Sequence, residues 1–143
     1  MIAVPHSIVL DSQALSLYAE SSAVMHPWIA AALRMNSILH ISTVTLAETT
    51  DGSARDANIR RVVKNMNRIY VSEAIAYEAG RLRARATGLR RKPRDVTIDA
   101  LVASTALSLR PPIIVLTSDE YDLTLLLEGT GVHVYKVGLV GAT

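Results

Sequence analysis

The order of the predicted elements indicates an α/β fold in which helices cover both faces of a mainly parallel sheet. Two observations carry this prediction. The segments 7–10 and 113–117 are short and almost wholly apolar, which is typical of strands buried on both faces. Amphipathic helical patterns alternate with such segments along the chain, as parallel strands joined by helical crossovers require. With 143 residues, half of them apolar, the chain (1–143) has the size of a single domain.

The first half of the chain is predicted to begin with a strand that ends at Asp11. Pro27 favours the first turn of a helix, Ser42 or Thr43 can cap another, and Asp51-Gly52 breaks that helix. The predicted elements are a strand over 7–10, a helix over 12–20, a helix from Pro27, a strand over 38–43, a helix carrying 46–48, a basic helix over 54–67, and a short strand or connector over 68–71.

The second half repeats the alternation. A helix over 73–87 carries an apolar stripe, and Gly88 ends it. Asp95 or Thr97 can cap the next helix, which Pro111-Pro112 ends. The remaining predicted elements are a loop over 89–95, a strand over 113–117, a helix over 120–128, a turn at 129–131 and a last strand over 132–137.

Carboxylates follow the predicted strands. Asp11 ends the first strand, Glu48 lies just after the second, and Asp119 follows the strand over 113–117 with Asp122 three residues on. Asp99 lies in the first turn of a predicted helix. Right-handed crossovers bring successive strand ends to one edge of a parallel sheet, where functional crevices form. These acids are therefore expected to converge, although each aspartate taken singly also fits a helix cap or a first-turn acid.

Convergence of these acids has an electrostatic cost. Two carboxylates about 4 Å apart repel by roughly 4 kcal/mol at an effective dielectric constant of 20. Protonation of one carboxylate or a bound divalent cation relieves this repulsion. The chain has no cysteine, so a thiolate zinc site is excluded. An all-oxygen donor set favours Mg²⁺ or Mn²⁺, which can activate water against a phosphodiester.

Four segments together resemble the PIN-domain family, and in particular the VapC-type ribonuclease toxins of prokaryotic toxin–antitoxin pairs. The resemblance covers nearly the whole chain, with the motifs in the family's order and at its separations. The segments are Ile8–Asp11, Thr45–Glu48, Ile98–Ala106 and Leu116–Leu123.

The resemblance implies a three-layer α/β/α sandwich and an Mg²⁺- or Mn²⁺-dependent endoribonuclease that hydrolyses RNA phosphodiester bonds to 5′-phosphate and 3′-hydroxyl ends. It also implies a homodimer silenced by a cognate antitoxin. The family's catalytic acids map to Asp11, Glu48, Asp99 and Asp119, of which the three aspartates are the expected metal ligands. Two alternatives remain: a PIN-fold nuclease of RNA processing without an antitoxin, and a non-catalytic RNA- or protein-binding module.

The resemblance also implies auxiliary residues around the acids. Asp122 matches the family's frequent extra acid, and Thr117, with Ser118 beside it, matches the hydroxyl that precedes the last acid. The chain departs from the family at Gln13, where many members carry Ser, Thr or Asn. This departure puts a metal- or phosphate-ordering role for that position in doubt.

Basic residues are concentrated in one window. Seven of the 15 Lys and Arg residues fall in 81–94, which contains no acid. The loop residues Arg90, Arg91, Lys92 and Arg94 are predicted to bind RNA phosphates beside the acidic crevice. There are two alternatives. Arg81 and Arg85 can simply solvate the outer face of their helix, or the loop can receive an acidic segment of an antitoxin.

The sequence favours a cytoplasmic protein with no membrane partner. The absence of cysteine fits a reducing compartment. The longest stretches without a charged residue, 21–33 and 35–47, have 13 residues each, whereas a membrane span needs about 20. No basic region opens the chain and Asp11 interrupts its first apolar run, so no secretory signal is expected.

Overall fold

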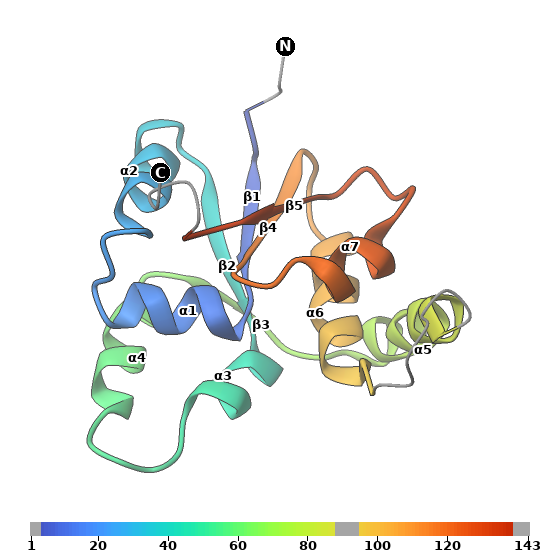
Figure 1. Cartoon of the computed structure of the whole chain (residues 1–143), viewed down its shortest axis with the longest axis horizontal. Helices are drawn as coiled ribbons and strands as arrows, with labels where there is room; N and C mark the ends of the chain where they lie inside the picture. Colours follow the sequence, from blue (N-terminus) through green and yellow to red (C-terminus); the bar gives the residue numbers. More distant parts are fainter. Residues whose placement is uncertain (1–3, 88–94, 139–143) are drawn as a thin grey trace.

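The structure, a computed structural model, describes residues 4–87 and 95–138. These residues form a five-stranded sheet in the order β3-β2-β1-β4-β5, and all neighbouring strands pair in parallel. Helices lie on both faces of the sheet (Figure 1). The α/β fold with a parallel sheet covered on both faces is therefore confirmed. The strands are β1 Ser7–Leu10, β2 Ile38–Ser42, β3 Asn67–Ile69, β4 Ile113–Thr117 and β5 His133–Lys136.

The helices occupy the segments between the strands. The helices are α1 Ser12–Ala19, α2 His26–Arg34, α3 Thr43–Thr49, α4 Asp56–Val63, α5 Glu73–Thr87, α6 Thr97–Leu107 and α7 Tyr121–Leu127. Within the described residues, no helix has both the length and the apolarity needed to cross a bilayer.

The core is divided by the sheet into two apolar layers, because side chains alternate along each strand. On β1, Ile8 and Leu10 pack with α1, α2 and α4, whereas Val9 packs with α5, α6 and α7. The helix α3 contacts both layers, since Leu46 packs against the first and Val44 against the second. It lies at the edge of the sheet where the strands end, which we call the carboxyl edge. The central strands are thus buried on both faces, as their apolar sequences predict.

The basic helix predicted over 54–67 is shorter in the structure. The helix α4 ends at Val63, and the backbone N–H of Met66 donates to the Val63 carbonyl at 2.9 Å in a tight turn. Asn67 then enters the sheet as the first residue of β3 and pairs with His40. The segment predicted as a strand or connector over 68–71 is therefore a strand that begins one residue earlier.

Candidate active site at the carboxyl edge of the sheet

Asp11 occupies the centre of the carboxyl edge. It follows β1, the middle strand, and its backbone N–H donates to the Leu116 carbonyl at 3.2 Å. Its carboxylate caps α1 by accepting from the Ala14 N–H at 2.9 Å. Only 7% of the residue is exposed. The same carboxylate thus starts a helix directly after the middle strand, so its helix-capping role and its predicted position at the end of a strand coexist.

Glu48 and Asp99 reach this edge from two other helices. The helix α3 begins directly after β2, where the Ser42 hydroxyl accepts from the Val44 N–H at 3.3 Å. That start places Glu48 on the second turn of α3, with its side chain exposed. Asp99 lies in the first turn of α6 and is half-buried.

The three carboxylates share one electrostatic field. Burial raises the pKa of Asp11, and the charge of Asp99 raises it further, against hydrogen bonds from Ala14, Thr117 and Gln13. Desolvation likewise raises the pKa of Glu48, and the charges of Asp99 and then Asp11 add to the effect. The structure therefore brings Asp11, Glu48 and Asp99 together, although they are spread over three elements.

Asp119 lies on the loop after β4 and is exposed, at the rim of this cluster. Its carboxylate accepts from the Tyr121 N–H at 3.3 Å beside the start of α7. Its own backbone N–H donates to Thr117 Oγ1 at 3.1 Å, and the Thr117 hydroxyl also bonds to Asp11. Thr117 therefore connects Asp119 with the buried Asp11, while Asp122 is buried in the first turn of α7.

Gln13 has a role that its sequence position did not reveal. Its Oε1 accepts from the Ser118 hydroxyl at 2.8 Å and lies 3.3 Å from Thr117 Oγ1. The side chain thus joins the first turn of α1 to the end of β4. Gln13 therefore holds the two hydroxyl groups of Thr117 and Ser118.

A surface hollow opens beside the acids, between α1 and α3. Its volume is about 380 Å³. It is lined by Ser12, Gln13, Ser16, Leu17, Glu48, Thr49 and Ser118. A larger cavity, of about 670 Å³, lies at the opposite edge and is mainly apolar. Volume alone would therefore point away from the titratable groups, and the polar hollow is the better candidate for chemistry.

The donor set at the carboxyl edge consists of carboxylate oxygens. Within the residues that the structure describes, no three His, Cys, Asp or Glu side chains are grouped closely enough to hold a metal ion together. Mg²⁺ commonly takes one or two protein carboxylates and keeps several waters. Asp11 and Asp99 are suited to bind such an ion, because the charge of each raises the pKa of a neighbouring carboxylate and a divalent cation would relieve that repulsion.

The predicted phosphate-binding residues Arg90, Arg91, Lys92 and Arg94 lie outside the described residues. The neighbouring arginines of α5 make intramolecular contacts instead. Arg81 pairs with Glu78 at 3.0 Å, and Arg85 donates to the Leu126 carbonyl at 2.6 Å. The described part of the basic window thus has structural partners, and the prediction for the loop stays a prediction.

Searches of sequences find no match, whereas solved structures match closely in shape. No family model and no curated protein matches the chain. A chain of VapBC2 from Rickettsia felis, bound to a promoter DNA fragment, aligns with a TM-score of 0.72 and 13% identity over 91% of this chain and 98% of that one. A chain of VapBC-1 from nontypeable Haemophilus influenzae aligns with a TM-score of 0.66 and 19% identity over 91% of this chain and 97% of that one. A chain of VapBC-5 from Mycobacterium tuberculosis aligns with a TM-score of 0.61 and 24% identity over 92% of this chain and 99% of that one.

These likenesses define the class of fold to which the chain belongs. At such low identities they establish the architecture, and they do so over almost the full length of both chains. The three-layer α/β/α sandwich implied by the resemblance to PIN domains is confirmed. The resemblance to the VapC type is confirmed at the level of the fold, because VapBC toxin–antitoxin complexes are among the solved structures that match.

Proposed function

We propose that the protein is a divalent-metal-dependent endoribonuclease that hydrolyses RNA phosphodiester bonds and is the toxin of a VapBC-type pair. The observation that carries this proposal is the convergence of Asp11, Glu48 and Asp99 at the carboxyl edge of a parallel sheet, with the pKa of Asp11 and of Glu48 raised. Like charges gathered where ligands bind in this fold class indicate a functional site.

Asp11 and Asp99 would hold Mg²⁺ or Mn²⁺, with Asp119 reaching the ion through water from the rim. Such an ion lowers the pKa of bound water and neutralises charge on the scissile phosphate. Glu48 is the exposed member of the cluster and borders the hollow. Its raised pKa suits a base that takes a proton from the attacking water. Attack by water leaves 5′-phosphate and 3′-hydroxyl ends.

The remaining residues orient the acids. The Ala14 N–H and the Thr117 hydroxyl both bond to Asp11 and fix the direction of its carboxylate. Gln13 and Ser118 hold the end of β4 beside it. Asp122, buried behind the rim, supports the start of α7. These contacts restrict the rotamers of the site, which is what positioning of a reacting group requires.

The test is cleavage of an end-labelled RNA by the purified protein with Mg²⁺, with Mn²⁺ and with EDTA. We expect cleavage with either ion and none with EDTA. Asp11→Asn and Asp99→Asn should remove it, whereas Glu20→Gln, an exposed acid at the far end of α1, should not. A 2′,3′-cyclic phosphate product, or full activity in both aspartate variants, would refute the assignment.

The antitoxin and the homodimer are separate parts of this proposal. Support for the antitoxin comes from the VapBC complexes among the structures that share the fold. Expression of the protein alone should arrest growth, and co-expression with the product of the adjacent upstream reading frame should relieve the arrest. Light scattering of the purified protein should give the mass of two chains. Cleavage without growth arrest or relief would favour an RNA-processing nuclease.

A further inference from the structure

A second hollow lies between α3, α4 and β3, at the edge strand of the sheet. Its volume is about 450 Å³. The floor is apolar, and three cationic side chains surround it, contributed by two turns of α4 and by β3. It is lined by Leu46, Thr50, Ile59, Arg60, Val63, Lys64 and Arg68. We refer to it as the basic groove.

Two of the three cations of the basic groove make no polar side-chain contact with another described residue. Arg60 in the last turn of α4 and Lys64, the residue that follows the helix, are exposed and lie four residues apart, where like charges repel. Within the described residues neither forms an ion pair or a side-chain hydrogen bond. Arg61, one position along, differs because it donates to the Ala19 carbonyl at 3.4 Å and ties α4 to α1. Arg68 donates to the Val63 carbonyl at 3.2 Å through one of the five N–H groups of its guanidinium.

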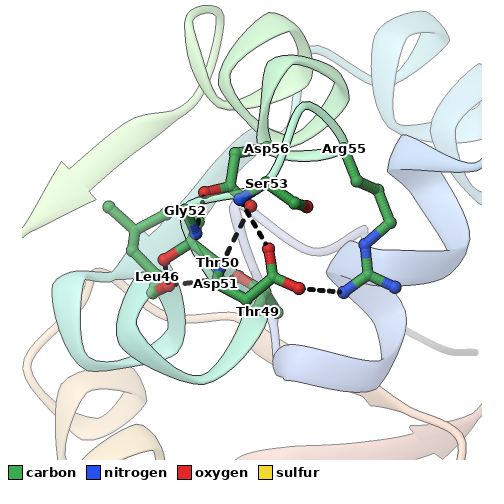
Figure 2. A network of polar contacts seen from close by, with 8 residues as sticks. All are labelled: Leu46, Thr49, Thr50, Asp51, Gly52, Ser53, Arg55 and Asp56. Carbon is green, nitrogen blue, oxygen red and sulfur yellow. Dashed lines mark hydrogen bonds and ion pairs between the residues drawn. The ribbon is translucent and has the colours of Figure 1, made fainter.

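The acids of the connection from α3 to α4 are already engaged. Figure 2 shows the connection from α3 to α4, in which Asp56 accepts from the backbone N–H groups of Asp51 and Gly52 at 3.1 and 2.8 Å. The Asp51 carboxylate in turn lies 3.5 Å from Arg55. Because these carboxylates face their own loop, they leave the positive charge of Arg60 and Lys64 available to an external anion.

The basic groove lies beside the same helix as the polar hollow between α1 and α3, which we call the active-site hollow. Leu46 and Thr50 of α3 line the groove, whereas Glu48 and Thr49 of α3 line the active-site hollow. The separation is therefore about one helix width, roughly 10–12 Å. The α3–α4 loop, which follows the shared helix, is braced by hydrogen bonds (Figure 2). A chain bound in one hollow can continue into the other.

We propose that the basic groove binds phosphates of a single-stranded RNA whose scissile bond lies at the acidic site. The proposal rests on the proposed nuclease function and adds the path of the substrate. A carboxylate cluster repels a polyanion, so cations a helix width away are needed to hold it. Arg60 and Lys64 contact phosphates, Arg68 adds a guanidinium fork, and the apolar floor accommodates sugar or base. An acidic protein segment is the competing occupant.

The test is the binding of a labelled single-stranded RNA oligonucleotide in EDTA, measured over a range of salt concentrations. The variant is Arg60→Gln/Lys64→Gln. Its matched control is Arg34→Gln/Arg110→Gln, which removes the same charge from exposed residues near the starts of β2 and β4. Each lost phosphate contact lowers the slope of log K against log salt by about 0.7. We expect a slope smaller by about 1.4 and roughly 10- to 30-fold weaker binding at 0.1 M salt, in the groove variant alone.

Several outcomes would overturn the proposal: no RNA binding by the unaltered protein, an unchanged slope in the groove variant, or equal losses in both double variants. Loss of binding to an oligoglutamate peptide with RNA binding intact would assign the groove to a protein partner instead. Cleavage with Mg²⁺ is measured separately. If RNA binding depends on the groove but no cleavage occurs, the proposed nuclease function is refuted and the RNA-binding role of the groove stands. If cleavage occurs but the salt slope is unchanged in the groove variant, the nuclease function stands and the role of the groove is refuted. Equal thermal melting of both variants shows that each is folded.

Discussion

The two edges of the sheet have opposite chemical character. At the carboxyl edge, Asp11, Glu48 and Asp99 gather beside a hollow of about 380 Å³. At the amino edge, near α2 at the other end of the strands (Figure 1), a cavity of about 670 Å³ is lined by apolar groups that include Trp28 and Tyr135. No Asp or Glu of the described residues lines it.

The difference shows how the fold separates function from stability along the same strands. The amino edge and the sheet interior remove apolar surface from water, which stabilises the chain. At the carboxyl edge, burial and then the charges of neighbouring carboxylates raise the pKa of Asp11 and of Glu48, which destabilises the metal-free protein. Substitutions of the acids at the carboxyl edge should therefore lower activity without lowering the free energy of unfolding. Substitutions at the amino edge should lower the free energy of unfolding without changing activity.

The largest expected effect is on catalysis at the carboxyl edge. Asp99→Asn should lower the rate of RNA cleavage by more than about 100-fold, since even groups that only support metal ligands cost 10- to 100-fold. The free energy of unfolding in EDTA should not fall, because the substitution removes repulsion from Asp11 and Glu48. Initial rates with Mg²⁺ and urea denaturation measure the two quantities. A stability loss in parallel with the activity loss would contradict the separation of the edges.

The next effect is on stability at the amino edge. Trp28 is half-buried on α2, and its ring centroid lies 5.8 Å from that of Tyr135 on β5. Trp28→Ala should lower the free energy of unfolding by about 1–3 kcal/mol through lost burial and ring contact. The rate of cleavage should be unchanged well below the melting temperature. The matched control is Leu33→Ala on the same helix, which is 72% exposed and should change stability by less than about 0.5 kcal/mol.

Much of the carboxyl edge follows from the sequence. The strands predicted over 7–10 and 113–117 have the bounds of β1 and β4, because a short run of apolar residues buried on both faces has few other structures available. Once those strands are fixed, the crossover rule places Asp11 and Glu48 at one edge. That rule, rather than any single motif, carries the prediction that the acids converge.

Features that depend on long-range pairing did not follow from the sequence. Gln13 meets Ser118 across 105 residues, and no local pattern reports such a contact. The basic pattern over 54–67 reads as one helix, but Asn67 bonds to His40 at 2.8 Å and joins the sheet, so that tertiary pairing overrides helical propensity. This early end of α4 is also what allows Arg68 on β3 to reach the basic groove.

A smaller effect is the pH dependence of stability without metal. The folded pKa of Asp11 and of Glu48 is raised, so between the unfolded values near 4 and the folded values the native state binds more protons than the unfolded state. The free energy of unfolding contributed by these groups therefore falls as pH rises through that window.

Asp11→Asn isolates this effect, because asparagine also caps a helix while carrying no charge. The stability difference between the variant and the unaltered protein should grow as pH rises through the window and then level, reaching about 0.5–2 kcal/mol at neutral pH. Urea denaturation in EDTA at a series of pH values measures it. Glu20→Gln, an exposed acid away from the cluster, should leave the pH profile unchanged. A constant difference across all pH values would argue against mutual repulsion at the carboxyl edge.

The smallest expected effect concerns residues at the carboxyl edge that position the acids and carry no charge themselves. Gln13→Ala removes the acceptor of the Ser118 hydroxyl and the contact with Thr117. A net loss of about 0.5–1.5 kcal/mol is typical of such a hydrogen bond. We expect a stability change at the lower end of that range, because Gln13 is exposed, and a several-fold slower cleavage because the end of β4 is held less firmly.

A double-mutant cycle separates this positioning role from a general effect of truncation. Ser118→Ala removes the donor of the same hydrogen bond, so Gln13→Ala/Ser118→Ala should slow cleavage little more than either single variant. Ser16→Ala is the control, since Ser16 lines the same hollow but makes no side-chain hydrogen bond to the end of β4 among the described residues. Multiplicative losses for Gln13→Ala and Ser118→Ala would mean that each side chain acts alone, and the connection between α1 and β4 would then have no part in orienting the acids.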